Sequence, residues 1–355
     1  MTKNFLEELE LFATSLTNFY ASSGRSLPWR DEVSPYRTWI SEIMLQQTRV
    51  DVVIPYFLRF MEALPRVEDL AQASEDELHL LWQGLGYYRR IRHAKEAAKE
   101  VVASYDGELP SGYEALRSLP GIGDYTASAI LSIAYHKPYA AMDGNLLRIF
   151  SRLFAEEGDI TKPKTVRLLK QHAEAPLPFI DPATYNQALM DLGATVCTPK
   201  SPSCDECPVQ EFCAAYEKGE VEKFPVKAKK KPPRVEKKTV LILSRDGQIA
   251  LHKRPEEGLL GGLWEPILLD GHLSEEDLDA FLFGMGLEKT SVLPLPSTRH
   301  VFSHIRWEMV GLLLQVKSAG LVAEEDITWV DPRDLSSYPM ASAVSFYRTW
   351  MEATL

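Results

Sequence analysis

Four cysteines lie between positions 197 and 213, and the 355-residue chain has no other thiol. Cys197, Cys204, Cys207 and Cys213 have the spacing C-x6-C-x2-C-x5-C. Disulfides would need an oxidising compartment and usually staple small domains, and the acidic N-terminal stretch MTKNFLEELELF lacks a secretory apolar segment. Zinc sites usually pair two short knuckles, whereas one central knuckle between two lone cysteines favours a 4Fe–4S cluster. Zinc remains the alternative on spacing alone.

Two carboxylates could perform acid–base chemistry. Glu42 lies in WISEIMLQQT between Trp39, Ile40, Ile43 and Met44, and burial on such a face would raise its pKa. Asp143 in AMDGNLLR precedes an apolar helical run, where an N-cap is the simplest role. Two carboxylates in different environments can divide the work of breaking a glycosidic bond, one as acid and one as stabilising anion.

The stretch SLPGIGDYTASAI (118–130) predicts a tight turn between two helices. Gly121 and Gly123 can adopt positive φ and let the backbone approach a ligand. The free N–H groups at the start of the second helix could then hold a phosphate. An ordinary helix-packing corner is the alternative.

The motifs LPWR (27–30), SEIMLQQTRV (41–50), GLGYYRR (84–90), LPGIGDYTA (119–127) and MDGN (142–145) occur in the order typical of MutY-type adenine DNA glycosylases. The resemblance covers residues 25–225 and continues more weakly beyond, and the cysteine spacing resembles the cluster loop of endonuclease III-like DNA glycosylases. It implies that Glu42 is the general acid, that Asp143 stabilises the cationic sugar and that Asn145 supports the carboxylates. Tyr125 stands where lyase relatives have a Schiff-base lysine, so the resemblance implies a monofunctional enzyme.

The same resemblance implies the residues that contact DNA. Gln47 and Tyr87 would enter the base stack, and Trp29 and Arg30 would line the adenine pocket. The full expected set for DNA or base binding is Trp29, Arg30, Leu45, Gln47, Thr48, Gly86, Tyr87, Gly121 and Gly123. A monovalent cation or calcium could accompany the helix–hairpin–helix. Arg89, Arg90 and Arg92 could form a phosphate patch or a solvated helix face.

The C-terminal part resembles the MutT-like domain of these glycosylases through HKRPEEGLLGGLWEPI (252–267). It lacks the R-E-x-x-E-E helix that binds magnesium in MutT-type hydrolases, so we expect it to recognise rather than to hydrolyse. By resemblance, Phe302, Ser303 and His304 would contact 8-oxoguanine.

These sites require two domains. Helical patterns fill residues 1–225 and predict an all-α domain, which the resemblance identifies as a glycosylase domain with a helix–hairpin–helix at 118–138 and an iron–sulfur loop at 197–213. Ser34, Thr48 and Ser74 are expected helix caps. VKAKKKPPRVEKK (226–238) carries seven Lys or Arg residues and one Glu, which predicts an exposed linker. Strand–turn–strand patterns around a helix predict an α+β MutT-like domain at 239–355.

The net charge of −11 excludes a uniformly basic DNA-binding surface, so the grip on DNA must be local. No apolar run approaches the ~18 residues of a membrane span. We expect a cytoplasmic protein, and the resemblance implies a monomeric, bacterial-type, nucleoid-associated enzyme that acts on duplex DNA with A:8-oxoguanine or A:G mispairs. A pyrimidine-damage glycosylase–lyase and a non-catalytic DNA-binding iron–sulfur protein are the alternatives.

Overall fold

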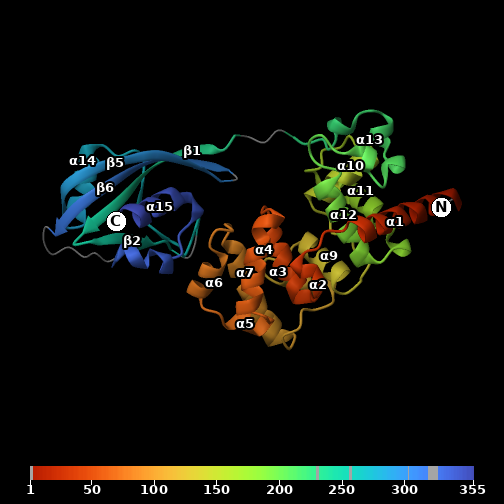
Figure 1. Ribbon diagram of the computed structural model, residues 1–355, viewed down its shortest axis with the longest axis horizontal. Helices are drawn as coiled ribbons and strands as arrows, with labels where there is room; N and C mark the ends of the chain where they lie inside the picture. The colour runs from red at the N-terminus through yellow and green to blue at the C-terminus, as the bar shows by residue number, and fades with distance from the viewer. Residues whose placement is uncertain (1–2, 229–231, 256–257, 303, 319–326) are drawn as a thin grey trace. The chain divides into compact units, whose positions relative to one another are not determined.

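The computed structural model describes residues 3–228, 232–255, 258–302, 304–318 and 327–355 (Figure 1). Its packing divides the chain into two compact units, Met1–Ala73 with Arg89–Lys229, and Ser74–Tyr88 with Lys230–Leu355. The first unit is helical, and the second contains the strands, so the predicted fold class is confirmed. Residues 74–88 group with the second unit, although they were expected within the helical domain. Among the described helices, none has the length and apolar character that crossing a membrane requires.

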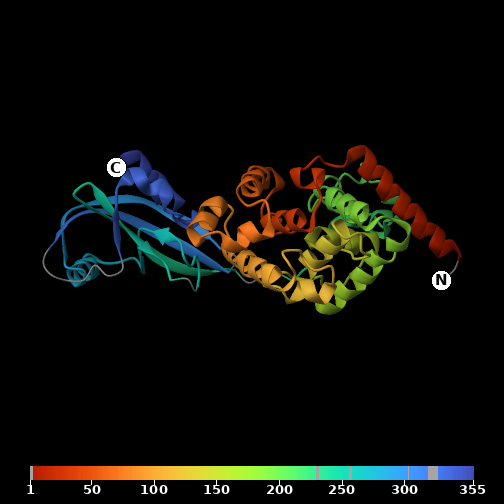
Figure 2. The same cartoon turned by 90° about the horizontal axis from the view of Figure 1, so that it is seen from below.

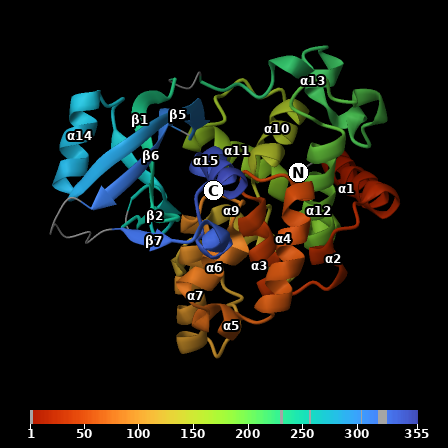
Figure 3. The same cartoon turned by 60° about the vertical axis from the view of Figure 1, so that its left-hand side comes forward.

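The helices up to residue 229 are α1 (Lys3–Ser23), α2 (Pro28–Asp31), α3 (Pro35–Leu45), α4 (Val50–Ala63), α5 (Val67–Gln72), α6 (Glu75–Trp82), α7 (Arg89–Ser104), α8 (Tyr113–Ser118), α9 (Asp124–Ile133), α10 (Gly144–Leu153), α11 (Pro163–Glu174), α12 (Pro182–Thr195) and α13 (Ala214–Glu217). Helix α1 runs along the outside of the helical unit (Figure 2) and packs against α12 (Figure 3). Helix α3 packs against α9, which brings two of the predicted catalytic motifs together.

Helix caps set where the functional segments begin. Ser34 accepts a hydrogen bond from the Arg37 N–H (3.1 Å) and caps α3, and Ser74 likewise caps α6, as predicted. The prediction that Thr48 caps α4 is wrong, because α4 begins after Arg49. Gln47 has a φ of 59°, so the chain turns sharply before the helix can start.

The helix–hairpin–helix consists of α8 and α9, so it spans 113–133 rather than the predicted 118–138. Gly121 has a φ of 77°, and a Cβ there would lie 2.8 Å from the His93 Cβ, so this turn requires glycine. Gly123 does not use the positive φ that glycine permits: its φ is −90°, and it serves as the N-cap of α9 without a side-chain cap.

The second unit contains one sheet with the strand order β3-β2-β1-β6-β5, and β4 and β7 pair with β1 and β2. The strands are β1 (Arg234–Arg245), β2 (Gln248–Lys253), β3 (Trp264–Glu265), β4 (Ile267–Asp270), β5 (Leu287–Val301), β6 (Ile305–Ser318) and β7 (Thr328–Val330). Its helices are α14 (Glu275–Gly284) and α15 (Ser345–Thr354). Leu278 of α14 packs with Leu241 on one face of the sheet, whereas Tyr347 of α15 lies against Gly311 on the other face (Figure 1).

The turn between β1 and β2 is the predicted Asp-Gly turn, with φ of 51° at Asp246 and 80° at Gly247. Strand β1 already begins at Arg234, where it pairs in parallel with Ile305 of β6. The predicted linker 226–238 is therefore too long at its C-terminal end, because its last residues belong to the sheet.

Candidate active site

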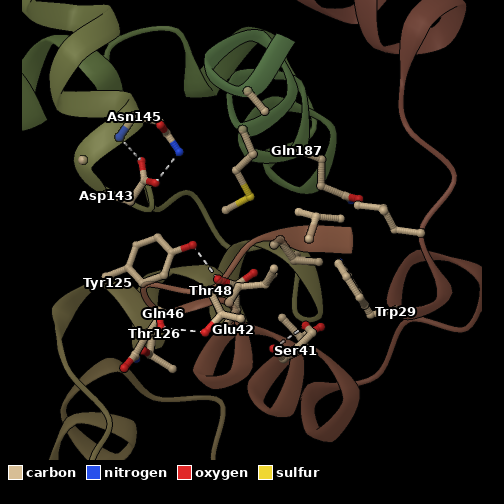
Figure 4. A pocket seen from close by; sticks show the side chains of 18 of the residues that line it. Trp29, Ser41, Glu42, Gln46, Thr48, Tyr125, Thr126, Asp143, Asn145 and Gln187 are labelled. Atoms are coloured by element: carbon tan, nitrogen blue, oxygen red, sulfur yellow. Dashed lines mark hydrogen bonds between the residues drawn. The ribbon is translucent and has the colours of Figure 1, made fainter. Parts of the chain in front are cut away.

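A cavity of about 710 Å³ in the first unit collects most of the predicted site residues. Its lining includes Trp29, Arg30, Glu42, Leu45, Gln47, Thr48, Gly121, Gly123, Tyr125, Asp143 and Asn145. Glu42 of α3, Tyr125 of α9 and Asp143 before α10 come from three separate segments and lie around the same cavity (Figure 4). The volume lies within the ~300–1,000 Å³ range of pockets that enclose small ligands.

Glu42 is the buried acid of this cavity, with 4% of its surface exposed. Burial raises the pKa of Glu42 to about 7; the hydrogen bond that the Tyr125 hydroxyl donates to Oε2 opposes this rise, and the nearby charge of Asp143 adds to it. A carboxyl with a pKa near neutrality is protonated in a large fraction of molecules at pH 7, so it can donate a proton. The burial and the raised pKa agree with the expectation from the apolar residues that flank Glu42 in the sequence.

Asp143 is held as the second carboxylate by the start of α10. Its Oδ1 accepts hydrogen bonds from the backbone N–H groups of Asn145 and Leu146 (both 2.8 Å), and its Oδ2 accepts one from the Asn145 side chain (2.8 Å; Figure 4). Burial raises the pKa of Asp143, and these hydrogen bonds oppose the rise. Asp143 is thus both the predicted N-cap and a carboxylate with three donors that favour its charged form.

Arg30 faces a carboxylate that the sequence analysis did not single out. Asp191, fully buried in α12, forms ion pairs with Arg30 (2.8 Å) and Arg25 (2.7 Å). Burial alone would raise the pKa of Asp191, but the hydrogen bonds and charge of Arg30, with help from Arg25, hold it below its ordinary value. Asp191 therefore fixes the guanidinium of Arg30 at the cavity wall. Gln187, one turn earlier, also lines the cavity and accepts a hydrogen bond from Tyr20 (2.8 Å).

The turn that carries Gln47 is anchored by Arg90. The Arg90 Nη1 donates to the carbonyl oxygens of Ile43 (2.5 Å), Met44 (3.1 Å) and Gln46 (2.7 Å), which are left without helical partners at the end of α3. These bonds hold the positive-φ residue Gln47 at the cavity wall. Arg90, expected in a phosphate patch or on a solvated face, thus binds backbone carbonyls.

Other predicted contacts lie in the second unit. Gly86 and Tyr87 both have positive φ, the Tyr87 side chain is 48% exposed, and the Trp82 indole donates to the Gly86 carbonyl (3.0 Å). Phe302 follows β5, and its ring packs edge-on against the buried Trp307 (4.9 Å between centroids). His304 is exposed, and Ser303 lies outside the described residues.

The four cysteines are free of disulfides and together line a small cavity beside α10. Burial raises the pKa of the Cys207 thiol to about 12, so this thiol needs a bound cation to become a thiolate near neutral pH. A single zinc ion would need its thiolates within about 2.3 Å of one point, yet no group of three His, Cys, Asp or Glu side chains in the described part of the chain is placed to hold one metal ion.

Arginines connect this loop to the catalytic cavity. The Arg152 Nη1 lies 3.3 Å from the Cys197 Sγ and donates to the Thr198 carbonyl (2.7 Å). The Arg148 Nε donates to the Cys197 carbonyl (2.8 Å), and its Nη2 donates to the side-chain oxygen of Asn145 (2.9 Å). Since the Asn145 amide donates to the Asp143 carboxylate, a continuous set of hydrogen bonds runs from the cysteine loop to Asp143.

Comparisons with known proteins agree with this geometry. Residues 40–175 match the HhH-GPD superfamily of base excision DNA repair proteins, residues 197–213 match the iron–sulfur binding domain of endonuclease III, and residues 239–347 match the NUDIX domain. The chain is 35% identical over 359 residues to the adenine DNA glycosylase of Mus musculus, covering 84% of this chain and 69% of that protein. The chain belongs to the adenine DNA glycosylases.

A second relative supports this assignment, and a solved structure supports the helical fold. The adenine DNA glycosylase of Schizosaccharomyces pombe is 32% identical over 417 residues, covering 97% of this chain and 90% of that protein. The structure of a thermostable thymine-DNA glycosylase superposes on the helical part of this adenine DNA glycosylase with a TM-score of 0.56 and 28% identity, covering 60% of this chain and 99% of that one.

The adenine DNA glycosylase therefore carries a 4Fe–4S cluster in the loop of residues 197–213, and Cys197, Cys204, Cys207 and Cys213 remain its predicted ligands. When bound, the cluster cross-links the loop through four iron–thiolate bonds. Protein purified without oxygen is expected to contain iron and inorganic sulfide in equal amounts, and Cys204→Ser should lower both. Stoichiometric zinc without sulfide, measured by elemental analysis, would contradict this expectation.

Several residues at this site were not predicted from the sequence. Asp191 in ALMDLGATV carried a usable signal, because a charge inside an apolar helix must find a partner if it is buried. Arg148 and Arg152 gave no such signal, since basic residues on a helix are usually solvated. Gln187 has no chemistry of its own that spacing could reveal.

Proposed function

We propose that this adenine DNA glycosylase hydrolyses the N-glycosidic bond of adenine mispaired with 8-oxoguanine or G in duplex DNA, and that it leaves an abasic site. The observation that carries the proposal is the pair of carboxyl groups at one cavity. Glu42 is buried with a single hydroxyl donor, and Asp143 has three donors. Because these environments differ, Glu42 is suited to act as the protonated acid and Asp143 as the charged carboxylate.

In this mechanism, adenine is flipped out of the duplex into the cavity, at a cost of a few kcal/mol that a mispair lowers. Gln47, held by the turn that Arg90 anchors, enters the stack from which the base departs. Protonated Glu42 donates its proton to a ring nitrogen of adenine. The base then leaves with the electrons of the C–N bond, and Asp143 stabilises the cationic sugar until water adds to it and passes a proton to the Glu42 carboxylate.

The absence of strand cleavage rests on Tyr125. The Tyr125 hydroxyl donates a hydrogen bond to Glu42, so this side chain lies at the cavity, in the sequence position where lyase relatives have a lysine. A phenol cannot form an imine with the sugar. Among the described residues that line the cavity there is no lysine.

The helix–hairpin–helix supplies a local grip on DNA. Helix α9 has no side-chain cap at Gly123, and a Cβ at this position would meet no atom within 4 Å. Its first N–H groups can therefore receive a phosphate oxygen, supported by the helix dipole. The Asp124 carboxylate in the first turn is bound by Arg117 (2.9 Å) and by the Tyr113 hydroxyl (3.0 Å), which reduces its repulsion of phosphate.

Single-turnover assays on duplexes that contain A:8-oxoguanine, A:G, A:T and an oxidised pyrimidine test the proposal. We expect release of free adenine from the first two, with strand breaks only after alkali treatment. Release of the oxidised pyrimidine, or strand breaks without alkali, would contradict the substrate or the monofunctional mechanism, respectively. DNA binding without base release would contradict catalysis.

The loop between β5 and β6 is proposed to select the opposite base. Each good hydrogen bond to a base supplies about 1–3 kcal/mol of discrimination, so Ser303→Ala combined with His304→Ala should reduce the preference for A:8-oxoguanine over A:G by roughly five- to 150-fold. Excision from A:G should change much less. His272→Ala, another exposed histidine of this unit, serves as the control. An equal loss on both duplexes would show that the loop supports the fold or general DNA binding.

A further inference from the structure

A second cavity, of about 480 Å³, shares no lining residue with the catalytic cavity. The helices that line it, α1, α10, α11 and α13, gather on one side of the helical unit (Figures 1 and 3). Its apolar wall includes Leu9 and Leu11 of α1, Leu153 of α10, and Phe154 and Phe212. We call this site the α1 groove.

The apolar wall of the α1 groove is open to solvent. The side chain of Leu11 is 54% exposed and that of Phe154 is 48% exposed. The Phe154 ring stacks on His172, with 3.8 Å between ring centroids and 16° between planes, so a preformed aromatic surface is available. Exposed apolar side chains such as Leu11 and Phe154, which lie in a groove over buried apolar residues, are typical of interaction sites.

The rim of the groove is acidic. Glu8, Glu211 and Glu217 line it, and none of its described lining residues is a lysine or arginine. Burial lowers the pKa of His172, so this ring is neutral at pH 7 and does not offset the negative charge. None of the ion pairs found in the described part of the chain engages these three glutamates. Such a rim repels the phosphates of DNA, so the groove remains available while the catalytic face binds its substrate.

We propose that the α1 groove binds a basic amphipathic helix of a partner protein. Apolar side chains one helical turn apart would fill the groove, as in other helix-in-groove complexes, and Lys or Arg side chains at the edges of that helix would pair with the three glutamates. A second copy of this chain is a poorer occupant, because each copy carries a net charge of −11 and like charges repel.

The test uses the full chain with its cluster and a fluorescein-labelled amphipathic helical peptide of leucine and lysine, followed by fluorescence anisotropy. A peptide with glutamate in place of lysine is the matched probe. We expect saturable binding of the basic peptide alone. Leu11→Ser combined with Phe154→Ala should weaken it at least about tenfold, since such anchors dominate binding energy. Glu8→Gln combined with Glu217→Gln should weaken binding and flatten its salt dependence. Phe283→Ser, which changes a side chain that is 81% exposed in the other unit, should have no effect.

Four results would overturn the proposal. They are unchanged affinity in both groove variants, equal binding of the acidic peptide, sedimentation showing a dimer that the groove variants abolish, and displacement of the probe by a peptide of residues 226–238. The last two results would assign the groove to a second copy or to this chain's own basic stretch. Circular dichroism, iron content and adenine release should be unchanged in every variant. If Leu11→Ser with Phe154→Ala does not fold, the glutamate variant decides the question, because its carboxylates are exposed.

Discussion

Glu42→Gln is expected to lower the single-turnover rate of adenine release by about 10²–10⁴-fold, the usual contribution of general acid catalysis. Glutamine has nearly the same shape, and its side-chain oxygen can still accept the hydrogen bond from Tyr125. The substitution therefore removes the proton while it preserves packing in the buried position. Affinity for the mispaired duplex, measured with a non-cleavable adenine analogue, should stay near that of the wild type. A variant that releases adenine at the wild-type rate would exclude Glu42 as the acid.

The pH profile provides a second measurement of the same role. Because Glu42 must be protonated to act and its pKa is raised to about 7, the wild-type rate should fall as the pH rises through about 7. This fall should disappear in Glu42→Gln. Tyr125→Phe removes a hydrogen bond that lowers the pKa of Glu42, so it should move the midpoint of the profile to higher pH. A midpoint that does not move would show that another group controls the profile.

Asp143→Asn is expected to lower the same rate by at least about 10²–10³-fold, the loss typical when one preorganised electrostatic contact to a transition state is removed. Asparagine caps helices as well as aspartate does, so its side-chain oxygen can still accept from the N–H groups of Asn145 and Leu146. The start of α10 should remain intact, and the loss should report the missing negative charge. The measurement is single-turnover release of adenine from an A:8-oxoguanine duplex.

Asp181→Asn is the matched control for this variant. Asp181 caps α12 by accepting from the Thr184 N–H (2.8 Å), and it does not line the catalytic cavity. It should leave the rate unchanged, and both variants should unfold close to the wild-type temperature. An equal rate loss in the two variants would mean that helix capping, rather than the charge of Asp143, supports activity.

The sequence predicted correctly those local features that depend only on neighbouring residues, such as helix starts and tight turns. The cysteine spacing predicted an iron–sulfur loop at 197–213, Ser34 and Asp143 predicted helix starts, and Asp246-Gly247 predicted a hairpin turn. Each of these features depends on a few adjacent residues, because a cap or a tight turn is satisfied within one turn of the chain. The same reasoning was wrong at Thr48, because α4 begins one residue later, after Arg49.

Only the tertiary structure decided the electrostatics of the site. The pKa of Glu42 depends on how completely α9 and its Tyr125 cover α3, and the hydrogen bond between them joins positions 83 residues apart. Arg30 and Asp191 form hydrogen bonds although they are 161 residues apart in the sequence, and Arg148 donates to the Cys197 carbonyl 49 residues away. A buried charge needs a partner, but many residues distant in the sequence could provide one. The sequence by itself therefore determined which groups could do the chemistry, and the packing of the helices decided which of these groups are in contact.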